Sequence, residues 1–219
     1  MPAPLREFYK GKRVLITLGS TREYLDPVRF LTNASSGKMG QALAHVFRSY
    51  GAKVFLICGP AIAPPKKFPF VAVGSAREMF AQVKKRFPLS DIFVSAAAVS
   101  DFRAENRSLR KIKREKEMFL KLVPNPDILE NVTRKKGGRF CVGFALEESA
   151  SGARAIQRAK EKMAKKRCDL LILNSPSSME SGWIRATILS PEGLILSLGK
   201  VSKEMCAKKI CGAIAESLR

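Results

Sequence analysis

The segment from Asn33 to Gly40 brings together residue types that suit an anion. Ser35 and Ser36 carry hydroxyl donors, and Gly37 lets a ligand approach the backbone closely. An apolar run at 14–18, typical of a buried strand, precedes the segment, and apolar residues with helical spacing follow at 41–47. A helix start offers unpaired backbone N–H groups and the positive end of the helix dipole, which suit phosphate or carboxylate. A well-capped helix without a ligand would show the same pattern.

Two well-known phosphate-binding motifs do not fit this segment. A P-loop has glycine where Thr32 stands and a hydroxyl residue where Met39 stands. A dinucleotide fingerprint needs three spaced glycines, and Gly37 and Gly40 supply only its second half. It also needs an acidic residue after the second strand, which here ends at Cys58. The sequence therefore argues against a P-loop enzyme and a nicotinamide oxidoreductase.

A second group of residues follows the apolar run at 91–97. The small side chains at 95–98 would let a flat ligand lie against the backbone, and Asp101 could accept hydrogen bonds from a sugar or base. The stretch 103–121 then carries eight cations against three acids, with Lys111 among them. This stretch is either a solvated charged loop or a clamp for phosphate groups. Further on, Lys162 and Lys166 are four residues apart and share one face of a predicted helix.

Strand-like and helix-like runs alternate along the chain, which indicates βαβ units and a mostly parallel sheet. The pattern predicts an α/β, Rossmann-like three-layer fold with a C-terminal β-hairpin, formed as one domain over residues 1–219. Loops that follow the strands would meet at the carboxyl edge of the sheet, where ligands usually bind. We expect strands at 14–18, 53–58, 71–73, 91–97, 139–145 and 169–173, helices at 38–50, 76–86, 126–135, 152–166 and 204–218, and a hairpin at 184–189 and 194–198.

Composition narrows the classes of function. The net charge of +21 favours polyanionic partners, either nucleic acid, an anionic membrane or phosphorylated small molecules. No apolar run is long enough to span a bilayer, and the first ten residues lack the apolar segment of a secretory signal. Five cysteines without Cys-x-x-Cys spacing favour reduced thiols in the cytoplasm. With His45 as the single histidine, we expect no transition-metal site.

Taken together, these residues resemble the phosphopantothenate–cysteine ligase family, from about residue 12 to the C-terminus. Single segments are weak signals, but their order along the chain is specific. The matching segments are Ile16-Thr17-Leu18-Gly19-Ser20-Thr21-Arg22-Glu23, Leu25-Asp26-Pro27-Val28-Arg29-Phe30, 33–40, Ala96-Ala97-Ala98-Val99-Ser100-Asp101-Phe102-Arg103, Lys111-Ile112-Lys113-Arg114, Val123-Pro124-Asn125-Pro126-Asp127-Ile128-Leu129 and Val142-Gly143-Phe144-Ala145.

Two positions depart from the family pattern. Ser20 stands where the family usually has Gly or Pro, and Ser100 where it usually has Ala, which adds a hydroxyl near the base pocket. The flavin-dependent decarboxylase domain found in many bacterial relatives is absent, so the chain resembles a stand-alone bacterial ligase. The loop at 35–40 resembles the CTP-using bacterial branch.

The resemblance implies a reaction of coenzyme A biosynthesis. The enzyme would join 4′-phosphopantothenate to L-cysteine and split CTP into CMP and pyrophosphate through an acyl-cytidylate. Mg²⁺ would enter with CTP and bridge its phosphates, with no dedicated metal site in the protein. The family generally forms homodimers in which each subunit helps to build its neighbour's site.

The resemblance also assigns roles to residues. Lys111 would neutralise the triphosphate, and the basic loop around it would fold over the nucleotide. Asn33 would hydrogen-bond the acyl group, and these two are the expected catalytic residues. The expected nucleotide-binding residues are Ser35, Ser36, Gly37, Ser95, Ala96, Ala97, Asp101, Lys111, Pro126, Asp127, Ile128, Leu129, Phe144, Lys162 and Lys166.

Two alternatives stay open at this point. A nucleic-acid-binding protein would explain the net charge, but such a protein is expected to carry aromatic residues among its cations. Between Arg103 and Lys121 the only aromatic residue is Phe119. A family member that binds nucleotide without turnover is the other alternative, although Asn33 and Lys111 are both retained. We expect small-molecule substrates, with neither nucleic acid nor membrane as partner.

Overall fold

The central element of the fold is an eight-stranded sheet. The computed structural model describes residues 3–114, 117–147, 152–178 and 181–218. The strand order is β12-β11-β10-β9-β6-β1-β4-β5. The strands from β10 to β5 are parallel to one another, and β11 and β12 are antiparallel additions at one edge. Their bounds are β1 Arg13–Leu18, β4 Lys53–Cys58, β5 Phe70–Ala72, β6 Ile92–Ser95, β9 Phe140–Leu146, β10 Leu170–Asn174, β11 Trp183–Ser190 and β12 Gly193–Ser202.

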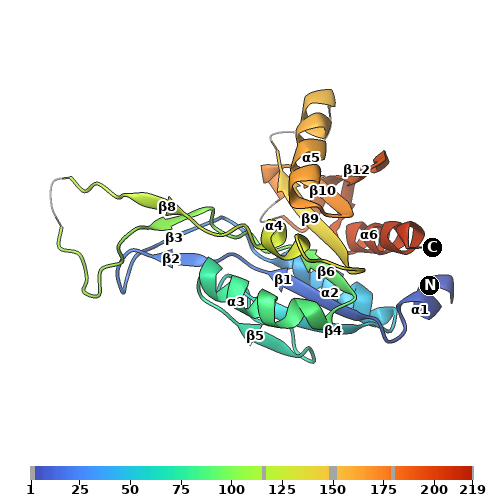
Figure 1. The fold of residues 1–219 in the computed structure, drawn as a ribbon, viewed down its shortest axis with the longest axis horizontal. Helices are drawn as coiled ribbons and strands as arrows, with labels where there is room; N and C mark the ends of the chain where they lie inside the picture. Colours follow the sequence, from blue (N-terminus) through green and yellow to red (C-terminus); the bar gives the residue numbers. More distant parts are fainter. Residues whose placement is uncertain (1–2, 115–116, 148–151, 179–180, 219) are drawn as a thin grey trace.

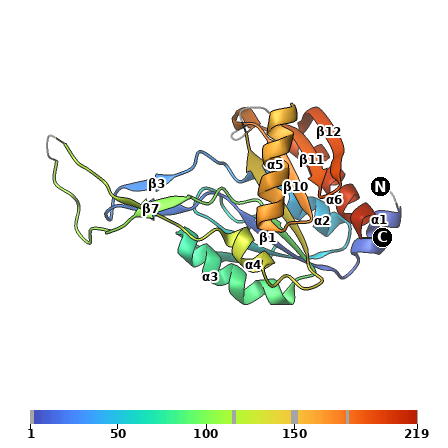
Figure 2. The ribbon, with the colours of Figure 1, turned by 45° about the horizontal axis from the view of Figure 1, so that its top comes forward.

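Helices cover both faces of the sheet (Figures 1 and 2). One face carries α1 (Ala3–Tyr9), α2 (Lys38–Ser49) and α6 (Lys203–Ser217), and the other carries α3 (Ala76–Arg86), α4 (Ile128–Thr133) and α5 (Ala153–Lys166). Short 3₁₀ turns lie at Phe87–Leu89 and Pro176–Ser178. The expected α/β fold of three layers, with its mostly parallel sheet and C-terminal hairpin, is confirmed.

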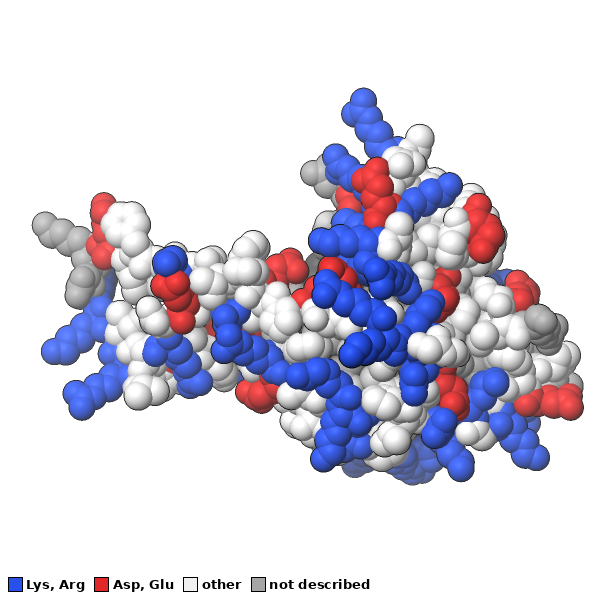
Figure 3. Space-filling model, in the orientation of Figure 1, with Lys and Arg blue, Asp and Glu red and all other residues white. Residues whose placement is uncertain are grey.

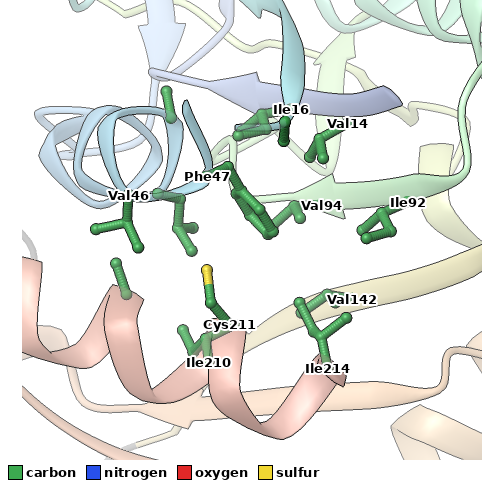
Figure 4. Close-up of a cluster of buried hydrophobic side chains, with 14 of the residues drawn as sticks. Val14, Ile16, Val46, Phe47, Ile92, Val94, Val142, Ile210, Cys211 and Ile214 are labelled. Atoms are coloured by element: carbon green, nitrogen blue, oxygen red, sulfur yellow. The ribbon is translucent and has the colours of Figure 1, made fainter. Parts of the chain in front are cut away.

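Side chains of successive strand residues alternate between the two apolar layers, as the pleat of a strand requires. In β1, Ile16 packs towards α2 and α6, whereas Leu15 packs on the opposite face. Figure 4 shows Phe47 of α2 beside Ile16 and Val94, with Ile210 of α6 below them. Burial on both faces explains why the central strands are continuous apolar runs.

A long arm projects from the sheet, at the left of Figure 1. Two hairpins form it: β2 (Arg22–Tyr24) pairs with β3 (Phe30–Thr32), and β7 (Phe102–Ala104) pairs with β8 (Leu122–Pro124). We use "the arm" for residues 22–32 together with the described residues of 102–124. Its distal side chains Leu109 and Phe119 are 89% and 91% exposed.

Most expected elements are confirmed, with bounds shifted by one or two residues. The helix expected at 126–135 is shorter, because Asp127 caps it and its regular part is Ile128–Thr133. The strand expected at 91–97 ends at Ser95. The arm hairpins and α1 were not predicted, because the three-residue strands of the arm lie among charged residues and α1 has only seven residues. In the described part of the chain, no helix has the length and apolar character needed to cross a bilayer.

Candidate functional site

The strand order reverses between β1 and β6, which places a crevice at their carboxyl ends. From β1 the chain leads to β4 and β5 on one side, and from β6 it leads to β9 and β10 on the other. In open α/β sheets ligands bind at such a switch point. A cavity of about 770 Å³ lies there, lined by the loop before α2, the segment after β6, the start of α4, the end of β9 and one side of α5.

The segments after β1 and β6 continue side by side beyond the sheet. The N–H of Ala98 donates to the Gly19 carbonyl at 2.9 Å, and the N–H of Ser100 donates to the Thr21 hydroxyl at 3.0 Å. Ser95, Ala96 and Ala97 are half-buried and line the cavity, as expected. Their small side chains leave the backbone accessible, so a flat ring can lie against it.

Glycines shape the loop that leads into α2. Gly37 has a φ of 69° and precedes the helix directly. A Cβ on Gly37 would lie 3.0 Å from the Cα and N atoms of Gly19. A Cβ on Gly40 would lie only 2.4 Å from the Cβ of Leu18. Gly37 lines the cavity, but its φ and its contact with Gly19 give it a structural reason that does not depend on a ligand.

Asn33 lies at the junction of the two loops. Its side-chain amide donates to the Val99 carbonyl at 3.0 Å and to the Ala98 carbonyl at 3.4 Å. It lines the cavity between the loop before α2 and the segment after β6. These bonds hold the amide nitrogen against the segment of small residues that follows β6. A carboxylate at this position would face two carbonyl oxygens, so an amide is the side chain that fits.

The start of α4 forms another wall of the cavity. The carboxylate of Asp127 accepts from the N–H of Glu130 at 3.0 Å and pairs with Lys166 at 3.0 Å. Pro126, Ile128 and Leu129 line the cavity beside it. Asp127 therefore has a structural role as the helix cap, which the sequence did not single out. Asp101 is exposed and lines the cavity, and its carbonyl accepts from the N–H of Asn125 at 2.7 Å.

The two predicted lysines of α5 line the cavity, each paired with an acid. Lys162 is 2.5 Å from Glu147, and Lys166 pairs with Asp127. The hydrogen bond from Lys162 is the main reason that the pKa of Glu147 lies below its ordinary value. Phe144 of β9 is half-buried and lines the cavity. An incoming phosphate would share these ammonium groups with the two acids.

Three further lysines of the cavity, Lys38, Lys165 and Lys203, were missed at the sequence level. Lys38 opens α2 and Lys203 opens α6. Lys203 is only 7% exposed, and burial followed by repulsion from Lys38 lowers its pKa below the ordinary value. Lys38 stands inside the motif that we singled out, whereas Lys203 is far away in sequence and carries no local signal. Other lining residues that were not predicted include Asn125, Asn174, Ser178 and Ile184.

The cavity has an excess of positive charge. Among the described residues, five lysines line it against the carboxylates of Asp101 and Asp127. In Figure 3, lysine and arginine side chains gather over this part of the molecule and continue onto the arm. Such a field favours a small ligand with several negative charges.

Two of the predicted site residues do not line this cavity. Ser36 lies in the loop before α2 but is not among the lining residues. Lys111 is exposed on the arm, which projects away from the sheet, and it does not line the cavity of its own chain (Figure 1), so its expected contact with the nucleotide stays a prediction. The remaining predicted residues are brought together around one cavity.

The titratable side chains give few options for a resident metal. Among the described residues, no three His, Cys, Asp or Glu side chains are grouped so as to hold an ion. His45 is exposed on α2 and packs edge-on against Phe68. The five cysteines are buried and unbridged, and burial raises the pKa of Cys58 to about 11.

Comparison with known proteins finds a family model and curated relatives of pantothenate and coenzyme A metabolism. The family model for the DNA/pantothenate metabolism flavoprotein C-terminal domain matches residues 9–218. The Coenzyme A biosynthesis bifunctional protein CoaBC of Vibrio parahaemolyticus is 38% identical over 216 residues, which cover 94% of this chain and 53% of that protein. The protein of the same name from Mycobacterium tuberculosis is 36% identical over 225 residues, with 95% and 53% covered. The chain thus spans about half the length of the curated relatives it matches.

Solved structures share the fold. The crystal structure of the C-terminal domain of Coenzyme A biosynthesis bifunctional protein CoaBC has a TM-score of 0.81 at 32% identity, covering 96% of this chain and 97% of that one. A Cab2 mutant in complex with phosphopantothenate-cysteine has a TM-score of 0.76 at 18% identity, covering 98% of this chain and 92% of that one, a likeness of fold.

Proposed function

The chain belongs to the family of the DNA/pantothenate metabolism flavoprotein C-terminal domain, and from that premise we propose that it is a phosphopantothenate–cysteine ligase of coenzyme A biosynthesis. The observation that carries the proposal is the lysine-lined cavity at the switch point between β1 and β6. The CoaBC relatives are named as bifunctional proteins of coenzyme A biosynthesis, and this chain corresponds to about half of them.

The reaction begins with activation of a carboxylate, because its oxygen is a poor leaving group. A carboxylate oxygen of 4′-phosphopantothenate attacks the α-phosphorus of CTP, and the bond to pyrophosphate breaks. The product is an acyl-cytidylate. The amine of L-cysteine then attacks the acyl carbon, the bond to CMP breaks, and the amine loses a proton. Such steps depend mainly on positioning and on charge stabilisation.

Side chains of the cavity are suited to these tasks. Ser95, Ala96, Ala97 and Phe144 leave a flat space for the base, and Asp101 would accept from the ribose or base. Lys162 and Lys166, with Lys38 and Lys203, would attract the triphosphate and the phosphate of the substrate. The nucleotide is proposed to be CTP, and Mg²⁺ would enter bound to its phosphates; among the described lining residues, lysines outnumber the two carboxylates of Asp101 and Asp127.

Asn33 would act at the acyl group. It is fixed against the Val99 carbonyl and lies between the loop before α2 and the β6 segment. A neutral amide does not titrate, and the longer of its two N–H bonds, at 3.4 Å to the Ala98 carbonyl, is the one that an acyl oxygen would replace. Its contact with the acyl oxygen would hold the acyl-cytidylate while cysteine attacks.

Lys111 is proposed to act on a neighbouring subunit. It lies on the arm, outside the cavity of its own chain, and the arm exposes apolar side chains such as Leu109 and Phe119. In a homodimer with a two-fold axis, each arm would reach its partner's cavity and bury these side chains. Lys111 would then neutralise the triphosphate as pyrophosphate departs, and removal of a contact of this kind typically raises the barrier by ~3–4 kcal/mol. A cytoplasmic location accords with the five unbridged cysteines.

A coupled assay of pyrophosphate release tests the proposal. The purified chain would be supplied with 4′-phosphopantothenate, L-cysteine, Mg²⁺ and, in separate reactions, CTP, ATP, GTP or UTP. We expect release that requires both phosphopantothenate and nucleotide, and a faster rate with CTP than with the others. Absence of release with every nucleotide contradicts the ligase assignment. Tight RNA binding with steep salt dependence, in place of turnover, would support a nucleic-acid-binding protein.

A further inference from the structure

Asp26 is a fully buried carboxylate in the turn that joins β2 and β3 of the arm. Its side chain has 0% exposure. Buried carboxylates are costly unless they are paired and hydrogen-bonded. The cavity at the switch point is lined by other residues, so Asp26 does not contact a ligand bound there.

Four donors surround the two oxygens of Asp26. Its Oδ1 accepts from the backbone N–H groups of Val28 and Arg29, both at 2.7 Å. Its Oδ2 accepts from Nη1 of Arg29 at 2.7 Å and from the backbone N–H of Ile112 at 3.1 Å. One oxygen thus shapes the turn, and the other joins the turn to a distant part of the chain.

Asp26 and Arg29 bind both the backbone N–H and the backbone carbonyl of Ile112. Its N–H donates to Asp26, and its carbonyl accepts from Nη1 of Arg29 at 3.1 Å. A further bond lies four residues earlier, where the N–H of Ser108 donates to the Leu25 carbonyl at 2.8 Å. The stretch 108–112 is therefore fixed to the β2–β3 turn at both ends.

We propose that Asp26, together with Arg29, is a positioning residue for Lys111. The proposal rests on the proposed function, in which Lys111 acts at the nucleotide. Lys111 precedes Ile112 directly, so the two bonds at Ile112 set where the Lys111 main chain lies along the arm. A long, flexible lysine on an unattached loop would spend little time near one phosphate group. The Asp26–Arg29 pair reduces that freedom without contacting the ligand.

Electrostatics agree with this role. Burial alone raises the pKa of a carboxylate, but the backbone donors Arg29, Val28 and Ile112, and then the charge of Arg29, outweigh it and lower the pKa of Asp26 to about 2. The carboxylate therefore stays ionised at neutral pH and keeps both of its oxygens as acceptors.

Asparagine cannot replace Asp26 in this arrangement. Its single oxygen can serve one pair of donors, and its NH₂ group would face the other pair. If the oxygen keeps the Val28 and Arg29 N–H groups, the NH₂ group faces Ile112 N–H and the guanidinium, and the link to Ile112 is lost. Asp26→Asn is thus a small change in volume that removes the bond from Ile112 N–H to the β2–β3 turn.

The experiment compares Asp26→Asn with a matched control, in wild type and in a Lys111→Gln background. Asp91→Asn is the control. Asp91 also pairs with an arginine, Arg13, and accepts a hydrogen bond from a backbone N–H, but it lies at the amino ends of β1 and β6, away from the cavity. We expect Asp26→Asn to lower kcat by about tenfold or more with a smaller change in KM. In the Lys111→Gln background it should cost no more than about twofold, because the group that it positions is already gone. Asp91→Asn should stay within about twofold of its parent in both backgrounds.

A second variant covers the case in which Asp26→Asn does not fold. Ile112→Pro removes the backbone N–H that donates a hydrogen bond to Asp26. The side chains of Asp26 and Arg29 and the N–H donors of the β2–β3 turn remain. This variant should show the same loss of kcat and the same lack of effect in the Lys111→Gln background. If folded Asp26→Asn, or Ile112→Pro in its place, loses as much activity with Lys111→Gln as without it, the positioning role is overturned. If the wild type itself shows no turnover, the proposed function fails instead.

Discussion

Exchange of the arm between two subunits makes a quantitative prediction about mixed dimers. Lys111 lies outside the cavity of its own chain, whereas Asn33 lines it. If an active site takes Asn33 from one chain and Lys111 from the other, then Lys111→Gln and Asn33→Asp damage different halves of each site. Each variant alone should be nearly inactive.

Mixing the two variants restores part of the activity. An equal, fully exchanged mixture contains about half heterodimers by random pairing. Each heterodimer has one site with both wild-type residues and one site with neither. The mixture should therefore recover about one quarter of the wild-type rate of pyrophosphate release. Co-expression with two different affinity tags would supply the mixed dimers.

A second mixture is the matched control. The double variant, with both substitutions in one chain, is mixed equally with wild type. Shared sites predict about one quarter of the wild-type rate, because only wild-type homodimers are intact, whereas sites built within one chain predict about one half. No recovery in the first mixture together with one half in the second would refute the shared site.

The remaining predictions concern single positions. Asn33→Asp places a carboxylate against the Val99 carbonyl, so kcat should fall by about a hundredfold, measured by pyrophosphate release at saturating substrates. Lys203→Met removes a buried ammonium group from the cavity and should raise the Kd for CTP by about tenfold in calorimetry, with an unchanged Kd as the contrary result. Gly40→Ala puts a Cβ 2.4 Å from the Leu18 side chain, so the free energy of unfolding should fall by about 1–3 kcal/mol in urea titrations, although alanine is the better helix former. Folding lowers the pKa of Asp26 from 3.8 to about 2, so its ionised carboxylate stabilises the protein above pH ~4, and this contribution is lost as the pH falls towards 2. In acid titrations, the free energy of unfolding should therefore fall less steeply with pH for Asp26→Asn than for the wild type.

Local sequence patterns were sufficient for most of the sheet and its helices. β4 and α3 have the expected bounds, because continuous apolar runs and a capping box, Ser75 with Glu78, are signals contained in a few residues. The arm was not predicted as a pair of hairpins. Its strands have three residues each, and their pairing depends on buried polar contacts such as those of Asp26 rather than on a repeating pattern.

The part of the candidate site that lies at the carboxyl ends of the strands was predictable from the sequence. Residues that follow β1, β6 and β9 meet because parallel strands end at one edge, and the sequence order alone places them there. Lys203 was missed because only the packing of α6 beside α2 brings it to the cavity. The position of Lys111 relative to the cavity depends on the direction of the arm, which no local pattern encodes.

Direct detection of the activated acid tests the central claim. The protein would be incubated with CTP, Mg²⁺ and 4′-phosphopantothenate, with L-cysteine left out, and the quenched mixture analysed by mass spectrometry. The proposed mechanism predicts the mass of a phosphopantothenoyl cytidylate, in an amount close to that of the active sites, and its conversion to the cysteine amide with release of CMP when cysteine is added. Unchanged CTP and phosphopantothenate in both reactions, from folded protein, would contradict it.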